Sequence, residues 1–181
     1  MGQFIYGMMQ SLDGYIDGPE GNVQLGPPDP VVFRHFVEHV RGVDSILYGR
    51  RMYEVMRYWD QEQANRDETE FAFAQVWRPK LKWVASRSLT SVGPNAALVR
   101  GDVIDFARKL KSDREGDIDV AGAELASVLS AAGLIDEYRL YFRPCVIGSG
   151  KPYFTGSPPP LRFVKSDPIG SNVVRLTYVP A

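Results

Sequence analysis

Three short segments of this chain place small residues, arginine or serine directly after apolar runs. They are Gly49-Arg50-Arg51, Ser86-Arg87-Ser88 and Ala121-Gly122-Ala123. Small residues let backbone amides approach a phosphate group closely, and arginine side chains offer forked hydrogen-bond donors to it. Because each segment follows a predicted strand, all three are expected at the carboxyl edge of one parallel sheet, where open α/β sheets bind ligands. Together they suit an anionic dinucleotide, although each one alone is more often a simple turn.

Two well-known phosphate-binding motifs are absent from the sequence. No G-x-G-x-x-G fingerprint follows the first apolar run. The segment Gly148-Ser149-Gly150-Lys151 is similar to the end of a P-loop, but Cys145 and Pro152 stand where that loop requires a glycine and a hydroxyl residue. A turn is therefore expected here.

Asp13 is the strongest candidate for a catalytic carboxylate. It follows the first predicted strand, where it would act as a catalytic residue that orients the substrate or relays a proton. The alternative is an aspartate that caps a turn before Gly14. Tyr15 and Trp59 are candidate substrate-binding residues together with Asp13, because aromatic rings stack on flat heterocycles; core packing is the alternative for both rings.

No metal site is expected from the ligand-type residues. His35 and His39 are four positions apart and would share one side of a helix, but no third ligand is evident, so a solvated helix face is expected. Cys145 is the only cysteine, which excludes an internal disulfide and a multi-thiolate metal site.

Length and composition describe an ordinary globular chain. Its 181 residues fit one domain, and 21 basic residues against 22 acidic ones give a net charge of -1. This balance argues against a general nucleic-acid binder, which needs a basic surplus. No long apolar run or basic leader is present, so neither a membrane span nor a signal peptide is expected, and the expected location is the cytoplasm.

Apolar runs alternate with amphipathic helical patterns, which predicts an α/β fold with a largely parallel sheet. The pattern predicts strands over residues 4–9, 45–48, 82–85 and 118–120, and helices around 33–42, from 49 onward, over 71–77, after 102 and up to 133. Residues 17–30 and 61–70 are predicted to be a long loop and a polar excursion. Residues 138–142 and 172–179 alternate with period two and are expected to be antiparallel, as a hairpin-like addition to the sheet edge.

The order of these motifs resembles the dihydrofolate reductase-like superfamily, and more closely the branch of the C-terminal reductase domain of the riboflavin-biosynthesis deaminase/reductase. The resemblance spans nearly the whole chain, through segments 11–16, 47–54, 84–89, 120–125, 133–138 and 144–154. The last two are the most specific, because their order and spacing rarely occur together by chance.

The resemblance implies a three-layer α/β/α sandwich with a mostly parallel mixed sheet and antiparallel C-terminal strands. It implies one reductase domain over residues 1–181, a homodimer, and NADPH as the cofactor, with no nucleic-acid or membrane partner. In the family, Gly49, Arg50 and Arg51 correspond to the pyrophosphate element. Ser86, Arg87 and Ser88 correspond to the residues at the adenosine ribose and its 2′-phosphate. Ala121, Gly122, Ala123, Glu124 and Leu125 correspond to the segment at the pyrophosphate and the nicotinamide ribose.

The chain departs from the family pattern at several positions. Met52 replaces a threonine of the phosphate element, and Ala121 replaces the first glycine of a pair. Gly7 and Val120 stand where riboflavin-pathway reductases usually carry a lysine and a glutamate, charges that a phosphorylated substrate would use. The acid that dihydrofolate reductases carry on their first long helix is also missing, since Glu38 is the only acid on that predicted helix.

The resulting hypothesis is an NADPH-dependent reductase that transfers a hydride to a small planar heterocycle of pteridine or pyrimidine type. Two alternatives stay open. One is the 5-amino-6-(5-phosphoribosylamino)uracil reductase of riboflavin synthesis; the other is a non-enzymatic nucleotide-binding protein on the same fold, which Met52 and Ala121 favour.

Overall fold

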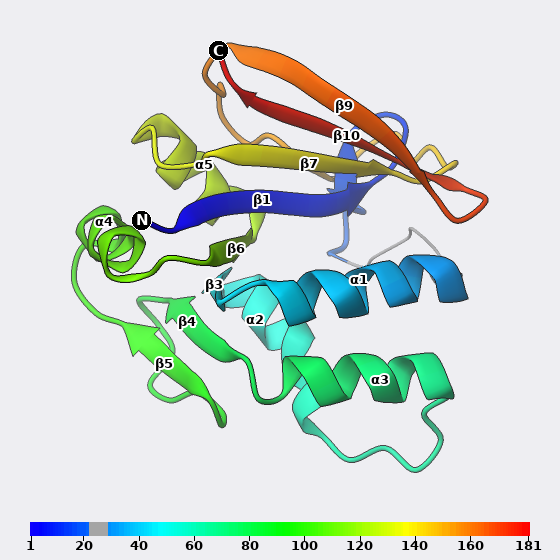
Figure 1. Cartoon of the computed structure of the whole chain (residues 1–181), viewed down its shortest axis with the longest axis horizontal. Helices are drawn as coiled ribbons and strands as arrows, with labels where there is room; N and C mark the ends of the chain where they lie inside the picture. Colours follow the sequence, from blue (N-terminus) through cyan, green and yellow to red (C-terminus); the bar gives the residue numbers. More distant parts are fainter. Residues whose placement is uncertain (22–28) are drawn as a thin grey trace.

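The computed structural model describes residues 1–21 and 29–181, and its centre is a mixed sheet. Much of the predicted loop over residues 17–30 falls on residues 22–28, outside the described part. In the described residues the main sheet has eight strands in the order β5-β4-β3-β6-β1-β7-β10-β9 (Figure 1). The strands are β1 (Gln3–Gln10), β3 (Ser45–Gly49), β4 (Leu81–Ala85), β5 (Ala96–Val99), β6 (Asp117–Ala121), β7 (Glu137–Phe142), β9 (Leu161–Ile169) and β10 (Val173–Pro180).

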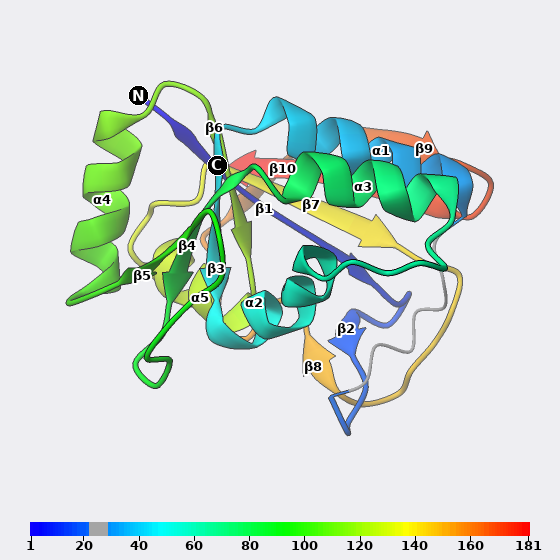
Figure 2. The ribbon, with the colours of Figure 1, turned by 90° about the horizontal axis from the view of Figure 1, so that it is seen from below.

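Helices cover both faces of this sheet, which confirms the predicted three-layer α/β/α sandwich. They are α1 (Pro30–Gly42), α2 (Arg50–Met56), a short 3-10 helix η1 (Arg57–Asp60), α3 (Glu68–Trp77), α4 (Val103–Asp113) and α5 (Ala123–Ala131). Helices α1 and α3 lie side by side, as Figures 1 and 2 both show. Their apolar residues form one core with β3 and β4, while α4 and α5 build a separate core with β1 and β6.

Local capping explains where the helices begin. Asp29 caps α1, with its Oδ1 accepting from the backbone N–H of Val32 at 2.9 Å. Asp102 caps α4 as predicted. Helix α3 starts earlier than expected, inside the predicted polar excursion, because Asp67 and Glu70 form a reciprocal capping box there.

The C-terminal part corrects one prediction. Strand β7 is not antiparallel to its inner neighbour: it runs parallel to β1, with Tyr6 opposite Tyr138, and only its outer side pairs antiparallel with β10. The reason is that α5 is a crossover helix, which returns the chain to the same end of the sheet before β7 starts. The outer pair β9 and β10 is the antiparallel, hairpin-like addition that the pattern predicts.

Two strands of the main sheet had no sequence prediction. Strand β5 is the segment Ala-Ala-Leu-Val, and alanine is depleted in strands, so its residues carry no strand signal. Strand β9 carries Lys165, Ser166 and Asp167 in succession and is largely exposed, so no apolar alternation marks it. A further small sheet joins β2 (Tyr15–Asp17) to β8 (Lys151–Pro152).

The two histidines do not form a solvated helix face, contrary to the sequence expectation. Both reach from α1 toward the sheet: His35 Nε2 lies 3.1 Å from the hydroxyl of Tyr141, and its ring packs edge-on against Phe36. Burial lowers the pKa of His35 to about 4, with further lowering by the positive charge of Arg175. His35 is therefore a neutral packing residue at neutral pH.

The low pKa of His35 predicts a loss of stability in mild acid. An unfolded histidine has a pKa near 6.5, so the contribution of neutral His35 is complete above that pH and is lost as the pH falls toward about 4. Between pH 7 and pH 4.5, we expect the free energy of unfolding to fall by about 2 kcal/mol more in the wild type than in His35→Gln. Urea titrations at the two pH values measure this difference, and equal falls in both proteins would contradict it.

Candidate active site

A cavity of about 1100 Å³ opens at the carboxyl ends of the central parallel strands. It brings together all three junctions that the sequence singled out. The cavity is lined by every cofactor-binding residue that the sequence predicted, namely Gly49, Arg50, Arg51, Ser86, Arg87, Ser88, Ala121, Gly122, Ala123, Glu124 and Leu125. Their gathering follows from the register, since β3, β4 and β6 are adjacent parallel strands that end at one edge.

The backbone at Gly122 is shaped for close approach. Its φ of 120° lies where L side chains are strained, and a Cβ there would sit 3.5 Å from the Cα and N atoms of Gly49. Gly122 is also the N-cap of α5, and no side chain caps the first turn of that helix. Backbone N–H groups at this helix end are therefore available to an anion in the cavity.

Charged side chains surround this end of the cavity. Arg50 pairs with Glu54 at 3.2 Å, whereas Arg51 and Arg87 have no hydrogen-bonded or ion-paired partner within the described part of the chain. The charge of Glu124 is balanced by an ion pair with Lys151, whose hydrogen bond and positive charge lower the pKa of the Glu124 carboxyl, with smaller contributions from Arg51 and Arg50. This end therefore presents net positive charge.

Ser86 shapes the turn that carries Arg87. Its Oγ accepts from the backbone N–H groups of Ser88 at 3.2 Å and Leu89 at 3.0 Å. The turn holds Arg87 exposed at the carboxyl end of β4.

The predicted catalytic residue Asp13 is not among the residues that line the cavity. Its carboxylate accepts from the backbone N–H groups of Ile147 at 3.1 Å and Gly148 at 2.7 Å. A hydrogen bond from Ser11 and these two amides lower the pKa of Asp13. Tyr15 does not line the cavity either, and lies in β2 opposite Pro152.

Trp59 is the one of the three proposed substrate-binding residues that does line the cavity. Its ring packs against Phe33 and Phe73, with ring centroids 6.1 Å and 4.8 Å apart. The Arg66 guanidinium also lies over the ring of Trp59, 5.2 Å from its centroid, so Trp59 is a packing residue that borders the cavity.

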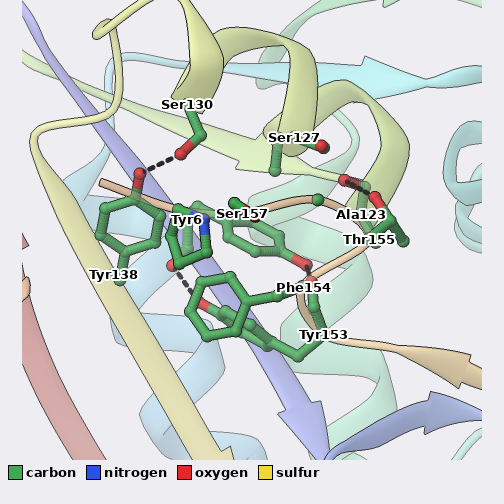
Figure 3. Close-up of a pocket in the computed structure, with 12 residues that line it drawn as sticks. Tyr6, Ala123, Ser127, Ser130, Tyr138, Tyr153, Phe154, Thr155 and Ser157 are labelled. Atoms are coloured by element: carbon green, nitrogen blue, oxygen red, sulfur yellow. Dashed lines mark hydrogen bonds between the residues drawn. The ribbon is translucent and has the colours of Figure 1, made fainter. Parts of the chain in front are cut away.

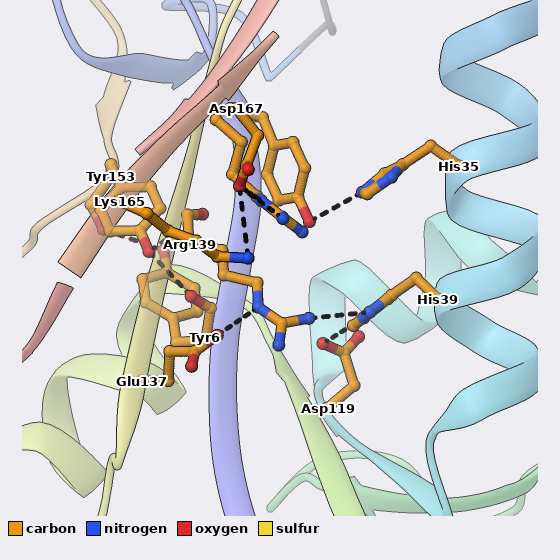
Figure 4. A network of polar contacts seen from close by, with 11 residues as sticks. Tyr6, His35, His39, Asp119, Glu137, Arg139, Tyr153, Lys165 and Asp167 are labelled. Atoms are coloured by element: carbon orange, nitrogen blue, oxygen red, sulfur yellow. Dashed lines mark hydrogen bonds and ion pairs between the residues drawn. The ribbon is translucent and has the colours of Figure 1, made fainter. Parts of the chain in front are cut away.

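Sequence reasoning missed a polar group deep in the cavity, formed by His39 and Asp119. Figure 4 shows His39 reaching from α1 toward Asp119 on β6 and Arg139 on β7. His39 Nε2 lies 3.0 Å from Asp119 Oδ1, and Arg139 Nη1 lies 3.2 Å from His39 Nδ1. Both His39 and Asp119 line the cavity. No sequence signal points to the pair, because the two residues are 80 positions apart and Asp119 sits inside a predicted strand.

A second, much smaller cavity lies between α5 and residues 153–158 (Figure 3). Tyr6 and Tyr153 border it, and each donates its hydroxyl hydrogen to the other's backbone carbonyl at 2.9 Å. Its volume of about 10 Å³ holds at most one water molecule, so it is a packing gap and no substrate site.

Within residues 1–21 and 29–181, no helix has the length and apolar character needed to cross a membrane. The same residues contain no group of three or more histidine, cysteine, aspartate or glutamate side chains arranged to hold a metal ion.

Comparison with solved structures confirms the fold. The chain aligns over its full length with 99% of a putative riboflavin biosynthesis protein from Shewanella sp. PV-4, with a TM-score of 0.77 and 22% identity. It also aligns over 98% of its length with 95% of the dihydrofolate reductase of Enterococcus faecalis complexed with NADP(H), with a TM-score of 0.63 and 14% identity.

Sequence comparison extends the relationship beyond the fold. The chain is 30% identical over 179 residues to the uncharacterized protein YyaP of Bacillus subtilis (strain 168), covering 97% of this chain and 94% of YyaP. The family model of the RibD C-terminal domain matches residues 3–175. A match over almost the whole chain, on the fold expected for it, shows that the protein belongs to the RibD C-terminal domain family.

Proposed function

We propose that this protein is an NADPH-dependent reductase, formed as one domain over residues 1–181, that transfers a hydride to a small planar heterocycle. The observation that carries the proposal is the convergence of the three phosphate-type junctions on a single cavity at the sheet edge. The cavity volume of about 1100 Å³ leaves room for a dinucleotide and a second small molecule. The similar enterococcal dihydrofolate reductase is described with NADP(H), which supports this cofactor.

The residues present fit NADPH. The cradle between Gly49 and Gly122 suits a pyrophosphate, which would accept from the uncapped N–H groups of α5 and from Arg51. Arg87, which has no ion-paired partner among residues 1–21 and 29–181, is the proposed partner of the 2′-phosphate that distinguishes NADPH from NADH. When bound, the nicotinamide supplies the hydride; the protein positions both reactants and excludes water from the cavity.

The apolar end of the cavity is the proposed substrate site. Phe33, Phe36 and Trp59 line it from α1 and η1, and their rings suit a flat heterocycle. Asp13 and Tyr15 lie outside this lining, so we assign them a positioning role: Asp13 fixes the loop at 147–148 through its two backbone hydrogen bonds.

The uracil reductase of riboflavin synthesis is the second candidate, because the family and the Shewanella protein's description favour it. The geometry at Gly7 favours a different substrate. Arg139 is the register partner of Gly7, where the family usually has lysine, but it contacts Glu137 and His39 and is not free for a phosphate. Growth of a strain that lacks the uracil reductase, restored by this gene, would decide for the riboflavin step.

The substitutions that favoured a non-enzymatic protein do not block the cavity. The methyl group of Ala121 is buried in the core cluster under α1 and α3. Met52 packs against the same cluster and also lines the cavity, with its Cβ 3.7 Å from the position that a Cβ on Gly122 would occupy. The cavity has its volume of about 1100 Å³ with both side chains in place, which supports the proposed dinucleotide.

Calorimetric titration with NADPH and NADH tests the cofactor assignment. We expect Arg87→Ala to weaken NADPH binding about 10- to 100-fold and to leave NADH binding nearly unchanged, because only NADPH carries the 2′-phosphate. Arg108→Ala is the matched control, since Arg108 lies on the exposed side of α4 and its one ion pair within the described residues is with Asp105, across a helical turn. Absence of binding by either nucleotide at millimolar concentration would reject the reductase proposal.

A homodimer through the outer strands is proposed as well. Strand β9 is at the end of the sheet, and its Phe163 and Val164 side chains are 53% and 44% exposed. Light scattering at micromolar concentration should give the mass of a dimer, and Phe163→Asp should give that of a monomer. Val146→Asp, a change at an exposed apolar residue outside β9, should leave the mass unchanged. A monomeric wild type would contradict the proposal.

A further inference from the structure

We infer that Tyr53 is a positioning residue for the proposed 2′-phosphate site, because its hydroxyl holds the part of the chain that carries Arg87. This role rests on the proposed function, which assigns Arg87 to the 2′-phosphate, and it adds what places that arginine. Tyr53 is not among the described residues that line the cavity. Its effect on the cofactor therefore passes through another residue.

The position of Arg87 is set by its backbone. Its side chain is exposed and has no hydrogen-bonded or ion-paired partner within residues 1–21 and 29–181. The Oγ of Ser86 fixes the start of the turn by accepting from the backbone N–H groups of Ser88 and Leu89. A side chain without a partner of its own goes where the backbone carries it. The contacts of the surrounding segment thus decide whether the guanidinium reaches a 2′-phosphate.

That segment, residues 86–95, joins β4 to its parallel neighbour β5 without a helix (Figure 1). Parallel neighbours usually have a helical crossover, whose backbone groups bond to one another. An irregular connection has few such internal bonds, so its polar backbone groups need partners elsewhere. In this connection Leu89 and Val92 pack against the core cluster that contains Tyr53. The connection therefore lies against the core beside α2.

Tyr53 ties the 86–95 connection to α2. Tyr53 is fully buried, and its Oη accepts from the backbone N–H of Gly93 at 2.7 Å. A Cβ on Gly93 would lie 3.3 Å from that oxygen and 3.0 Å from Oδ2 of Asp60, so this backbone lies directly against both side chains. The ring of Tyr53 is also held: its centroid is 6.1 Å from that of Tyr48 and 5.9 Å from the Arg57 guanidinium.

The Tyr53–Gly93 contact connects the two proposed phosphate sites. Helix α2 carries Arg50 and Arg51 at its N-terminus, in the lining of the cavity, and Tyr53 within the same turn. The 86–95 connection carries Arg87. NADPH can reach both sites only if the arginines of α2 and Arg87 keep their spacing, since one molecule carries both phosphate groups. NADH lacks the 2′-phosphate, so its binding does not depend on this spacing.

Calorimetric titration of Tyr53→Phe with both nucleotides tests the role of the hydroxyl. The variant keeps the ring and loses one hydrogen bond, so we expect NADPH to bind about 3- to 10-fold more weakly and NADH to change by less than about twofold. Tyr138→Phe is the matched control, because it removes another buried tyrosine hydroxyl, 2.5 Å from Ser130 Oγ and outside the cavity lining. It should leave both affinities unchanged. An unchanged ratio of the two affinities in Tyr53→Phe overturns the inference.

A double variant tests the route through Arg87. In the Arg87→Ala background, adding Tyr53→Phe should not lower the preference for NADPH any further, because the side chain that Tyr53 positions is gone. A purely structural loss would instead weaken both nucleotides alike in either background. A further fall in the NADPH preference of the double variant would place the effect of Tyr53 elsewhere and overturn the inference.

Hydrogen exchange in the wild type gives a readout that needs no variant to fold. Coupling between two sites is reciprocal, so a Gly93 contact that favours the 2′-phosphate must be strengthened by it to the same extent. The Gly93 amide, followed by NMR, should exchange about 3- to 10-fold more slowly with saturating NADPH than with saturating NADH. A wild type that prefers NADPH but shows equal exchange rejects the inference alone. A wild type that binds neither nucleotide rejects the proposed function, and the inference falls with it.

Discussion

Replacing Gly122 with alanine should weaken NADPH binding about 100-fold, a loss of roughly 3 kcal/mol. Two effects add. The φ of 120° strains any residue with a Cβ, and the new methyl group would occupy the cradle 3.5 Å from the backbone of Gly49, where the pyrophosphate is proposed to lie. Calorimetric titration of the variant with NADPH measures the change.

Gly133→Ala is the matched control for backbone strain. Gly133 follows the other end of α5 and also has a positive φ, of 67°, but a Cβ there would meet nothing within 4 Å. It should therefore lose a similar amount of stability, about 1 kcal/mol, and bind NADPH as the wild type does. Unchanged NADPH affinity in Gly122→Ala, or equal weakening in both variants, would contradict the proposed cradle.

The largest expected effect on stability is at Asp136. Asp136→Ala should lower the free energy of unfolding by about 3 kcal/mol, because it removes one partner of a mostly buried ion pair and strands the other. Lys111 Nζ lies 2.6 Å from both carboxylate oxygens, and Oδ2 also accepts from the backbone N–H of Phe4 at 2.7 Å. The side chain of Lys111 is only 11% exposed and that of Asp136 34%, so water would replace these contacts only in part, and the carbonyl of Leu134, 3.2 Å from Nζ, would be the remaining acceptor for Lys111. Urea denaturation monitored by tryptophan fluorescence gives the value.

A second ion pair on the same helix provides the comparison. Lys109 and Asp113 are 2.9 Å apart on the exposed side of α4. Asp113→Ala should leave the unfolding transition nearly unchanged, because exposed pairs contribute little. Equal destabilisation by the two substitutions would show that burial does not set the strength of the Lys111–Asp136 pair.

The fold followed from the sequence where periodic burial is strong. The spacing of apolar residues shows which face of an element is buried. This spacing is clear in strands β1, β3, β4 and β6 and in the helices between them. The direction of β7 did not follow, because an alternating strand looks the same whether its neighbour runs parallel or antiparallel. The outer strand β9 buries almost nothing, so its residues carry no pattern to read.

The candidate site likewise has one part that the sequence predicted and one part that it did not. Glycine and arginine at strand ends could be placed at one sheet edge from the sequence, because parallel strands separated by helices deliver their carboxyl ends to the same side. The sequence could not decide whether Asp13 is a catalytic residue or one that caps a turn. Its hydrogen-bond partners, the backbone N–H groups at 147–148, are more than 130 positions away in the chain. For His39 the sequence showed only its spacing of four residues from His35 on a helix. That spacing does not predict its contacts with Asp119 and Arg139.

The sequence by itself determined the family, the layered α/β architecture and the edge where a dinucleotide would bind, because each depends on local patterns repeated along the chain. Only the tertiary structure decided which other polar side chains line the cavity with these junctions. Helix α1 packs across the sheet and brings His39 over Asp119 and Arg139, from strands on either side of β1. Their contact depends on strand order and helix packing, which are set by burial summed over the whole molecule and by no short segment of it.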